Sequence, residues 1–112
     1  MNFLEKSITY IHQNVTNPEL SVENLAFHLL MSRSQTYRKI KALTGQSATE
    51  FIRTVRLKMA ITLFEEGILN ISEIAYKTGF TSPAYFTKCF RMQFGKSPTE
   101  YFADSGKKNT QK

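Results

Sequence analysis

Apolar residues recur at helical spacing along most of the chain, and residues that typically cap helices bound each stretch. The N-terminal stretch carries Phe3, Leu4, Ile8, Ile11 and Val15, which share one face of a helix. Serine or asparagine precedes the later stretches and glycine follows several of them, as expected of N-caps and of left-handed helix ends. No segment alternates polar and apolar residues over the length of a strand. The pattern predicts an all-α protein with about seven helices.

Two parts of the chain resemble each other at an offset of 49 to 50 residues. Residues 21–31 read SVENLAFHLLM and residues 70–80 read NISEIAYKTGF, with the same order of capping, apolar and aromatic positions. Residues 32–52 and 82–102 continue the match, with identical pairs at Ser32/Ser82, Gly45/Gly95, Ser47/Ser97, Thr49/Thr99 and Glu50/Glu100. Internal repeats indicate repeated structural units. The sequence therefore predicts the same helix, tight turn and helix in each half.

Capping residues set the limits of the second helix in each half, which we expect at 33–43 and 83–94. Each begins after a serine and ends before a glycine. Pro83 suits the first position of the later helix, because the N–H that a proline lacks would have no partner there. A short last helix should begin after Ser97, since Ser97 and Glu100 form a capping box.

A longer helical stretch, residues 47–67, joins the two halves and ends at Gly67. It bears two apolar stripes, one formed by Phe51, Ile52, Val55 and Met59 and the other by Leu57, Ala60, Ile61 and Phe64. A helix that is apolar on two sides must be covered on two sides, so we expect one half to pack on each stripe. The predicted division is a first helix-turn-helix subdomain at 1–46, a linker helix at 47–67, a second subdomain at 68–104 and a disordered basic tail at 105–112.

The net charge of +6 is distributed unevenly along the chain. Residues 32–60 contain seven basic residues and one acid, Glu50, while bases and acids cancel over the remainder. A solvated helix face normally mixes its signs, so this basic segment indicates an anionic partner such as nucleic acid. Its cations are Arg33, Arg38, Lys39, Lys41, Arg53, Arg56 and Lys58.

The remaining chemistry argues against several other classes of protein. A single cysteine, Cys89, excludes an internal disulfide and is expected as a small core residue. His12 and His28 each lie on a helix without a second metal ligand nearby, so we expect surface or partly buried histidines. No catalytic grouping stands out, and we expect neither an enzyme nor a cofactor or metal. No stretch approaches the ~18 apolar residues of a membrane span, and a reducing cytoplasm is the expected compartment.

The second helix of each half has a polar face suited to a DNA major groove. In the earlier helix this outer face is formed by Ser34, Tyr37, Arg38 and Lys41, opposite Thr36, Ile40 and Leu43. In the later helix it is formed by Ala84, Thr87, Lys88 and Arg91, opposite Phe86, Phe90 and Phe94. Arg38 and Lys88 occupy corresponding positions. Arginine can pair bidentately with guanine, whereas lysine makes looser contacts to the same edge or to phosphate.

Two competing functions stay open on these residues. A helical protein-interaction module would use the basic face to dock an acidic partner. An RNA-binding protein would need exposed aromatic rings on which bases stack. Most of the nine Phe and five Tyr residues fall in the predicted core stripes, which counts against RNA.

Three motifs occur in order along the chain: Arg-Leu-x-x-Ala in the linker helix, Ile-x-Glu-Ile-Ala-x-x-x-Gly-Phe at 71–80, and Phe-Gly-x-Ser-Pro at 94–98. With their spacing, residues 4–103 resemble the tandem, homeodomain-like helix-turn-helix domain of the AraC/XylS family of bacterial transcription regulators. The stretch Arg-Ser-Gln-Thr-Tyr-Arg-Lys at 33–39 is most similar to output domains of two-component and hybrid-sensor regulators. The resemblance implies sequence-specific binding of duplex DNA, with helices 33–43 and 83–94 each entering a major groove.

Carried over by position, the family's base-reading sites fall on Ser34, Tyr37, Arg38, Pro83, Ala84, Thr87 and Lys88. The expected phosphate-contacting residues are Ser32, Arg33, Lys41, Thr81, Ser82 and Arg91. The resemblance further implies RNA polymerase as a partner, no membrane association, and a single domain acting as a monomer on DNA, with any dimer formed through an N-terminal domain. Because Met1 directly precedes the first predicted helix, we expect either an output domain cut from a larger regulator or a small stand-alone one.

Overall fold

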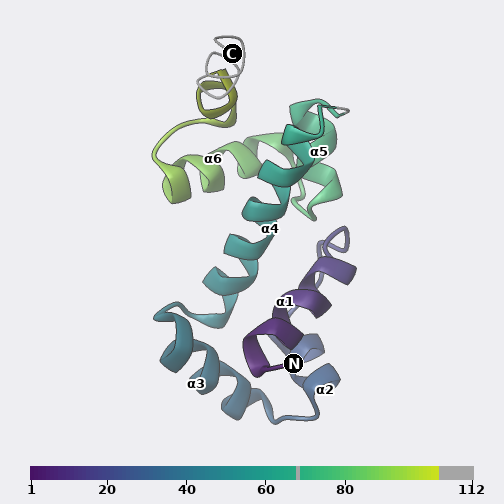
Figure 1. Cartoon of the computed structure of the whole chain (residues 1–112), viewed down its shortest axis with the longest axis vertical. Coiled ribbons are helices and arrows are strands. Elements are labelled where there is room, and N and C mark those ends of the chain that lie inside the picture. Colours follow the sequence, from purple (N-terminus) through teal and green to yellow (C-terminus); the bar gives the residue numbers. More distant parts are fainter. Residues whose placement is uncertain (68, 104–112) are drawn as a thin grey trace.

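A computed structural model describes residues 1–67 and 69–103 (Figure 1). The described residues form helices and turns without a strand. Six helices have both ends described: α1 (Phe3–Gln13), α2 (Val22–Leu29), α3 (Arg33–Thr44), α4 (Ala48–Glu65), α5 (Ile71–Lys77) and α6 (Pro83–Phe94). A further helical segment runs from 98 to 103, where the description ends. The all-α class and the expected number of helices are confirmed, while the tail predicted at 105–112 lies outside the described residues.

Local capping chemistry explains where the helices begin. Each of α1 to α5 starts with a capping box, in which the side chains of the N-cap and of the third helical residue bond to each other's backbone N–H. At α4 the Ser47 hydroxyl accepts from Glu50 N at 3.1 Å, and Glu50 Oε1 accepts from Ser47 N at 2.9 Å. This bond from the Ser47 N–H lowers the pKa of the Glu50 carboxyl. The capping box predicted at Ser97 and Glu100 is present as well.

The two halves repeat in space as they do in sequence. The helix pair α2 and α3 corresponds to α5 and α6, and both second helices end at a left-handed glycine, Gly45 and Gly95. The turn inside each pair is left-handed too, but its residue differs. In the second half it is Gly79, whereas in the first it is Leu30, with φ of 57° and a side chain that is 92% exposed.

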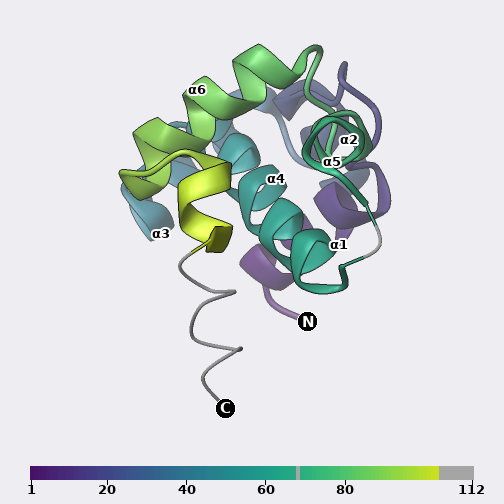
Figure 2. The same cartoon turned by 90° about the horizontal axis from the view of Figure 1, so that it is seen from above.

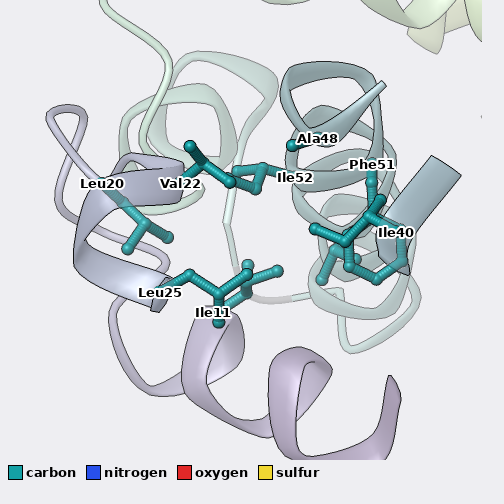
Figure 3. Packing of buried hydrophobic residues seen from close by; sticks show 9 residues of the cluster. Ile11, Leu20, Val22, Leu25, Ile40, Ala48, Phe51 and Ile52 are labelled. Carbon is teal, nitrogen blue, oxygen red and sulfur yellow. The ribbon is translucent and has the colours of Figure 1, made fainter. Parts of the chain in front are cut away.

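The central helix α4 contributes to two separate hydrophobic cores. Phe51, Ile52 and Val55 pack with residues of α1, α2 and α3 in the first core, most of which Figure 3 shows converging. Leu57 and Ala60 pack with residues of α5, α6 and the last helical segment in the second core. The prediction that each apolar stripe of this helix is covered by one half is confirmed.

Helix packing gives the molecule an elongated shape, 48 × 25 × 24 Å along its principal axes. The extensive helix contacts lie either within one half or between a half and α4. Figure 1 accordingly shows α1 to α3 around one end of α4 and α5 and α6 around the other. We call these two groups of helices the first and second modules.

Candidate nucleic-acid interface

The outer face of α3 presents the residues that the sequence predicted for base reading. Ser34 and Arg38 are exposed, and Tyr37 is half-buried at the edge of the first core. Thr36 and Ile40 are fully buried on the opposite face. Leu43, grouped with them on the inner face by sequence, is half exposed instead, in the last turn of the helix.

Arg33, a predicted phosphate contact, already has partners at the start of α3. Its Nε lies 3.2 Å from Glu23 Oε1 of α2, and its guanidinium lies over the Tyr37 ring at 5.4 Å. Hydrogen bonding to Tyr37 and the nearby Glu23 carboxylate raise the pKa of Arg33. Because an exposed ion pair of this kind contributes little stability, it can give way to a phosphate at little cost.

Lys41, another predicted phosphate contact, lies exposed near the C-terminal end of α3. Its Nζ donates to the Gly45 carbonyl at 2.9 Å, which satisfies one of the free carbonyls at the end of the helix. A lysine has three donors, so this bond leaves donors for a phosphate. Lys39 points to another side, with its ammonium 5.0 Å from the centre of the Phe3 ring of α1.

The second module presents α6 in the same way. Ala84, Lys88 and Arg91 are exposed, Pro83 and Thr87 are half-buried, and Phe86 and Phe90 are buried inward. Phe94, predicted to point inward, is half-buried against the second core. Thr81 is exposed just before the helix, and Ser82 caps it by accepting from Tyr85 N at 3.1 Å. The capping bond uses only the acceptor function of Ser82, so its hydroxyl can still donate to a phosphate.

A cavity of about 290 Å³ lies between the modules, and residues of both candidate reading helices line it. Its wall includes Tyr37 of α3, Thr81 and Tyr85 at the start of α6, and Arg53 of α4. Figures 1 and 2 show α3 and α6 on the same side of the molecule, one towards each end of α4. The two helices that carry the predicted contacts therefore lie on one side of the molecule.

Two residues of this wall were not among the predicted contacts. Arg53 is half-buried between the modules. It was counted among the cations of the basic segment, but no contact was predicted for it. Tyr85 faces the same cavity, and its hydroxyl has a raised pKa, chiefly because it bonds to Cys89. At neutral pH Tyr85 therefore keeps its proton and remains a hydrogen-bond donor.

Arg56 departs from the expectation that the basic segment forms a surface. It is only 6% exposed, and its guanidinium donates to backbone carbonyls at Val15 (2.6 Å), Asn17 (2.9 Å) and Thr78 (2.9 Å). Its charge is thus held inside the protein and does not reach a partner. Of the seven basic residues in the segment, Arg56 therefore does not contribute to a charged surface.

The remaining candidate chemistry lies where the sequence placed it. Cys89 is buried in the second core, and His12 and His28 are exposed. Within residues 1–67 and 69–103 no group of three or more His, Cys, Asp or Glu side chains is arranged to hold a metal ion. The helices described in those ranges are all too short or too polar to cross a membrane.

Comparison with known proteins relates this chain to helix-turn-helix domains. The model of a helix-turn-helix domain family matches residues 25–104. Histidine kinase P4 of Formosa agariphila is 40% identical over 98 residues, which are 88% of this chain and 7% of that protein. The chain spans about a third or less of the length of this relative and of two other curated relatives that it matches.

Solved structures of similar fold include a protein–DNA complex. The DNA-binding domain of AdpA, a global transcriptional factor, in complex with a target DNA matches with a TM-score of 0.84 at 28% identity, over 100% of both chains. The C-terminal domain of AraT, a response regulator from Geobacillus stearothermophilus, matches with a TM-score of 0.77 at 28% identity, over 90% of this chain and 84% of that one.

Proposed function

Since this chain belongs to the AraC-type helix-turn-helix family of DNA-binding transcription regulators, we propose that it binds one asymmetric duplex site, with α3 and α6 in successive major grooves. The observation that carries the proposal is the position of α3 and α6 on one side of α4, with Tyr37 of one helix and Tyr85 of the other lining a common cavity. Binding would serve the control of bacterial transcription, with the domain as the output part of a regulator.

The dimensions of the molecule support simultaneous insertion of both helices. The 18 residues of α4 extend over about 27 Å, and the long axis of the described chain measures 48 Å. Successive major grooves on one face of DNA lie about 34 Å apart. Two modules at opposite ends of α4 can therefore meet both grooves, with some bending of the DNA if the helices are held close to parallel.

We assign direct base contacts to the outer faces of the reading helices. In α3 they are Ser34, Tyr37 and Arg38, and in α6 they are Pro83, Ala84, Thr87 and Lys88. Phosphate contacts are assigned to Ser32, Arg33, Lys41, Thr81, Ser82 and Arg91. Arg53 joins the phosphate contacts in this proposal, because it lies in the wall between the two modules, where the DNA backbone between two successive grooves would pass.

Arg38 and Lys41 are expected to have different roles. Arg38→Ala should cost about 1–3 kcal/mol of binding free energy and relax the preference at one base pair, because a bidentate contact to guanine is lost. Lys41→Ala should weaken binding to all duplexes alike, because a phosphate carries no sequence information. Titrations of both variants against the selected site and against random duplex DNA measure the difference. Equal losses for Arg38→Ala on both DNAs would contradict the assigned reading face.

Selection of bound sequences from a random duplex library tests the proposed function. We expect two unlike clusters of preferred bases about 10 base pairs apart, because the reading residues of α3 and α6 differ and one module meets each groove. Lys88→Ala should weaken the base preference only in the cluster that α6 reads. A perfectly palindromic motif, or a single cluster unaffected by Lys88→Ala, would contradict tandem reading. Binding without any sequence preference would favour a protein-docking role for the basic face.

The partners and setting follow from the same proposal. One chain occupies the asymmetric site as a monomer, and RNA polymerase is the machinery on which the bound regulator acts, in the cytoplasm. The proposed division of labour keeps 1–46 and 68–104 as the two reading subdomains and 47–67 as the helix between them. No enzymatic step is part of this role.

A further inference from the structure

Arg56 lies at a place where both modules and the central helix meet. Its partners Val15 and Asn17 belong to the loop between α1 and α2, in the first module. Thr78 is the C-cap of α5, in the second module. Figure 1 shows this loop and the turn after α5 side by side next to α4. One side chain of the central helix therefore holds a segment of each module.

We call Arg56 together with its partners Val15, Asn17 and Thr78 the joint. The acceptors that face the Arg56 charge in this joint are all backbone carbonyls. Among the described residues no carboxylate lies within ion-pair distance of Arg56. Its charge is met instead by carbonyls at or just beyond the C-terminal ends of α1 and α5, where the helix dipole is negative. Burial lowers the pKa of the guanidinium from its ordinary value, yet an arginine keeps its proton in proteins. A neutral side chain of similar length would leave the buried carbonyls of Val15 and Thr78 and the partly buried carbonyl of Asn17 without these donors.

The glycine after Thr78 shows how closely the joint is fitted. A side chain at Gly79 would collide with the Arg56 guanidinium and with the Val15 carbonyl. Positive φ alone does not demand glycine at this turn, because Leu30 adopts the same left-handed conformation at the equivalent turn of the first module. The difference is that Leu30 faces solvent, whereas Gly79 is buried against Arg56. Glycine is needed here because the arginine takes the space.

A second contact also links the two halves: the Thr54 hydroxyl of α4 donates to Gln93 Oε1 of α6 at 3.4 Å, and Gln46 Nε2, just after α3, donates to the same hydroxyl at 3.0 Å. The hydroxyl of Thr16 donates to the Lys77 carbonyl at 3.0 Å, at the same joint. The helix pairs in extensive contact do not include any pair between α1 to α3 and α5 to α6. The relative rotation of α3 and α6 therefore depends on α4, on this joint and on the contact between Thr54 and Gln93.

We propose that Arg56 is a positioning residue that sets the base-pair spacing between the two half-sites which the chain accepts. This inference rests on the proposed tandem reading. Inserting one base pair between the clusters rotates the second groove by about 34° and moves it by about 3.4 Å. A fixed joint cannot follow that change, whereas a loosened joint spreads the second module over several positions and lowers its effective concentration at the best one.

The test measures affinity for duplexes in which the two selected clusters are separated by the native spacing or by one or two base pairs more or fewer. We expect the native chain to lose about tenfold in affinity on a one-base-pair insertion, and Arg56→Met and Arg56→Lys to lose about threefold or less. Gly79→Ala should behave like the arginine variants, since it disturbs the joint from the other side. Leu30→Ala, at the equivalent exposed left-handed turn, is the matched control and should keep the native spacing profile.

The spacing profile separates positioning from plain loss of fold. A variant that merely reduces the folded fraction weakens binding to every duplex by the same factor, so an unchanged profile in all three joint variants would overturn the proposal. Spin labels at positions 42 and 92, one on each reading helix of a Cys89→Ser background, give a readout without DNA. The distance distribution between them should broaden in the joint variants, and an unchanged distribution would count against the proposal. If the native chain shows no second cluster or no spacing preference, tandem reading itself fails, and this is seen before any variant is made.

Discussion

Raising the salt concentration from about 50 to about 200 mM is expected to weaken binding to duplex DNA by about 250- to 1000-fold. Each neutralised phosphate releases condensed counterions, so the logarithm of affinity falls linearly with the logarithm of salt concentration. About five phosphate contacts give a slope of about −4 to −5. The exposed cations of α3, α4 and α6 can supply them, whereas Arg56, which is buried, makes no contribution.

The measurement is a series of equilibrium titrations with one duplex at increasing salt concentration. Lys41→Gln removes one phosphate contact and should make the slope shallower by about 1. Lys58→Gln serves as the matched control, since Lys58 is an exposed cation of α4 outside the assigned contacts. A flat salt response would remove the nucleic-acid function altogether. A slope that changes equally in both variants would mean that the contacts are spread over the general basic surface.

Phe90→Ala is expected to destabilise the fold by about 3–5 kcal/mol, the usual loss when a buried phenylalanine is cut back to alanine. Phe90 is 0% exposed. Its ring contacts those of Phe86, Phe94, Tyr101 and Phe102 at centroid distances from 4.6 to 5.9 Å. The substitution therefore opens a cavity where α6 and the last helical segment meet. Small domains have only about 5–15 kcal/mol of total stability, so a large part of it is lost.

Urea unfolding followed by circular dichroism measures this loss. Phe27→Ala is the control, because the Phe27 side chain is 85% exposed and surface substitutions usually change stability by about 0.5 kcal/mol or less. Similar unfolding free energies for the two variants would contradict the packing described for the second module. The comparison is made without DNA, so it is independent of the binding predictions.

Local signals were enough to predict the helices and most of the exposed faces of α3 and α6. The capping boxes at Ser21, Ser32 and Asn70 are short-range patterns, and each one opens a helix where it was expected. The stripes of α4 are also local, since helical periodicity alone distinguishes its two apolar faces. The sequence repeat then indicated that both ends of this helix carry the same arrangement.

The role of Arg56 could not be predicted in the same way. Its partners are backbone carbonyls 22 to 41 residues away in the chain, and a carbonyl leaves no mark in the sequence. In the sequence, a basic residue beside an apolar stripe looks the same whether its side chain reaches solvent or is buried. Arg56 was therefore counted with the surface charges. Gly79 was the available hint, because its counterpart Leu30 shows that the turn can form without glycine.

The cavity between the modules could not be predicted from the sequence, for a related reason. It depends on how α3 and α6 are set against α4, and Tyr37, Arg53 and Tyr85 come from three different helices. Periodicity places each residue on a face of its own helix, but it does not fix the angle between helices. Arg53 was therefore counted as a charge without being placed in the wall that both reading helices share.

The sharing of α4 by both cores makes this domain indivisible as a piece of chain. Phe51 and Val55 serve one core, and Leu57 and Ala60 serve the other a single turn later. A break at any point between Ala48 and Glu65 would deprive at least one fragment of a wall of its core. Neither helix-turn-helix is therefore expected to fold when it is transferred alone to another protein. The smallest unit that can be transferred is the pair of modules together with α4.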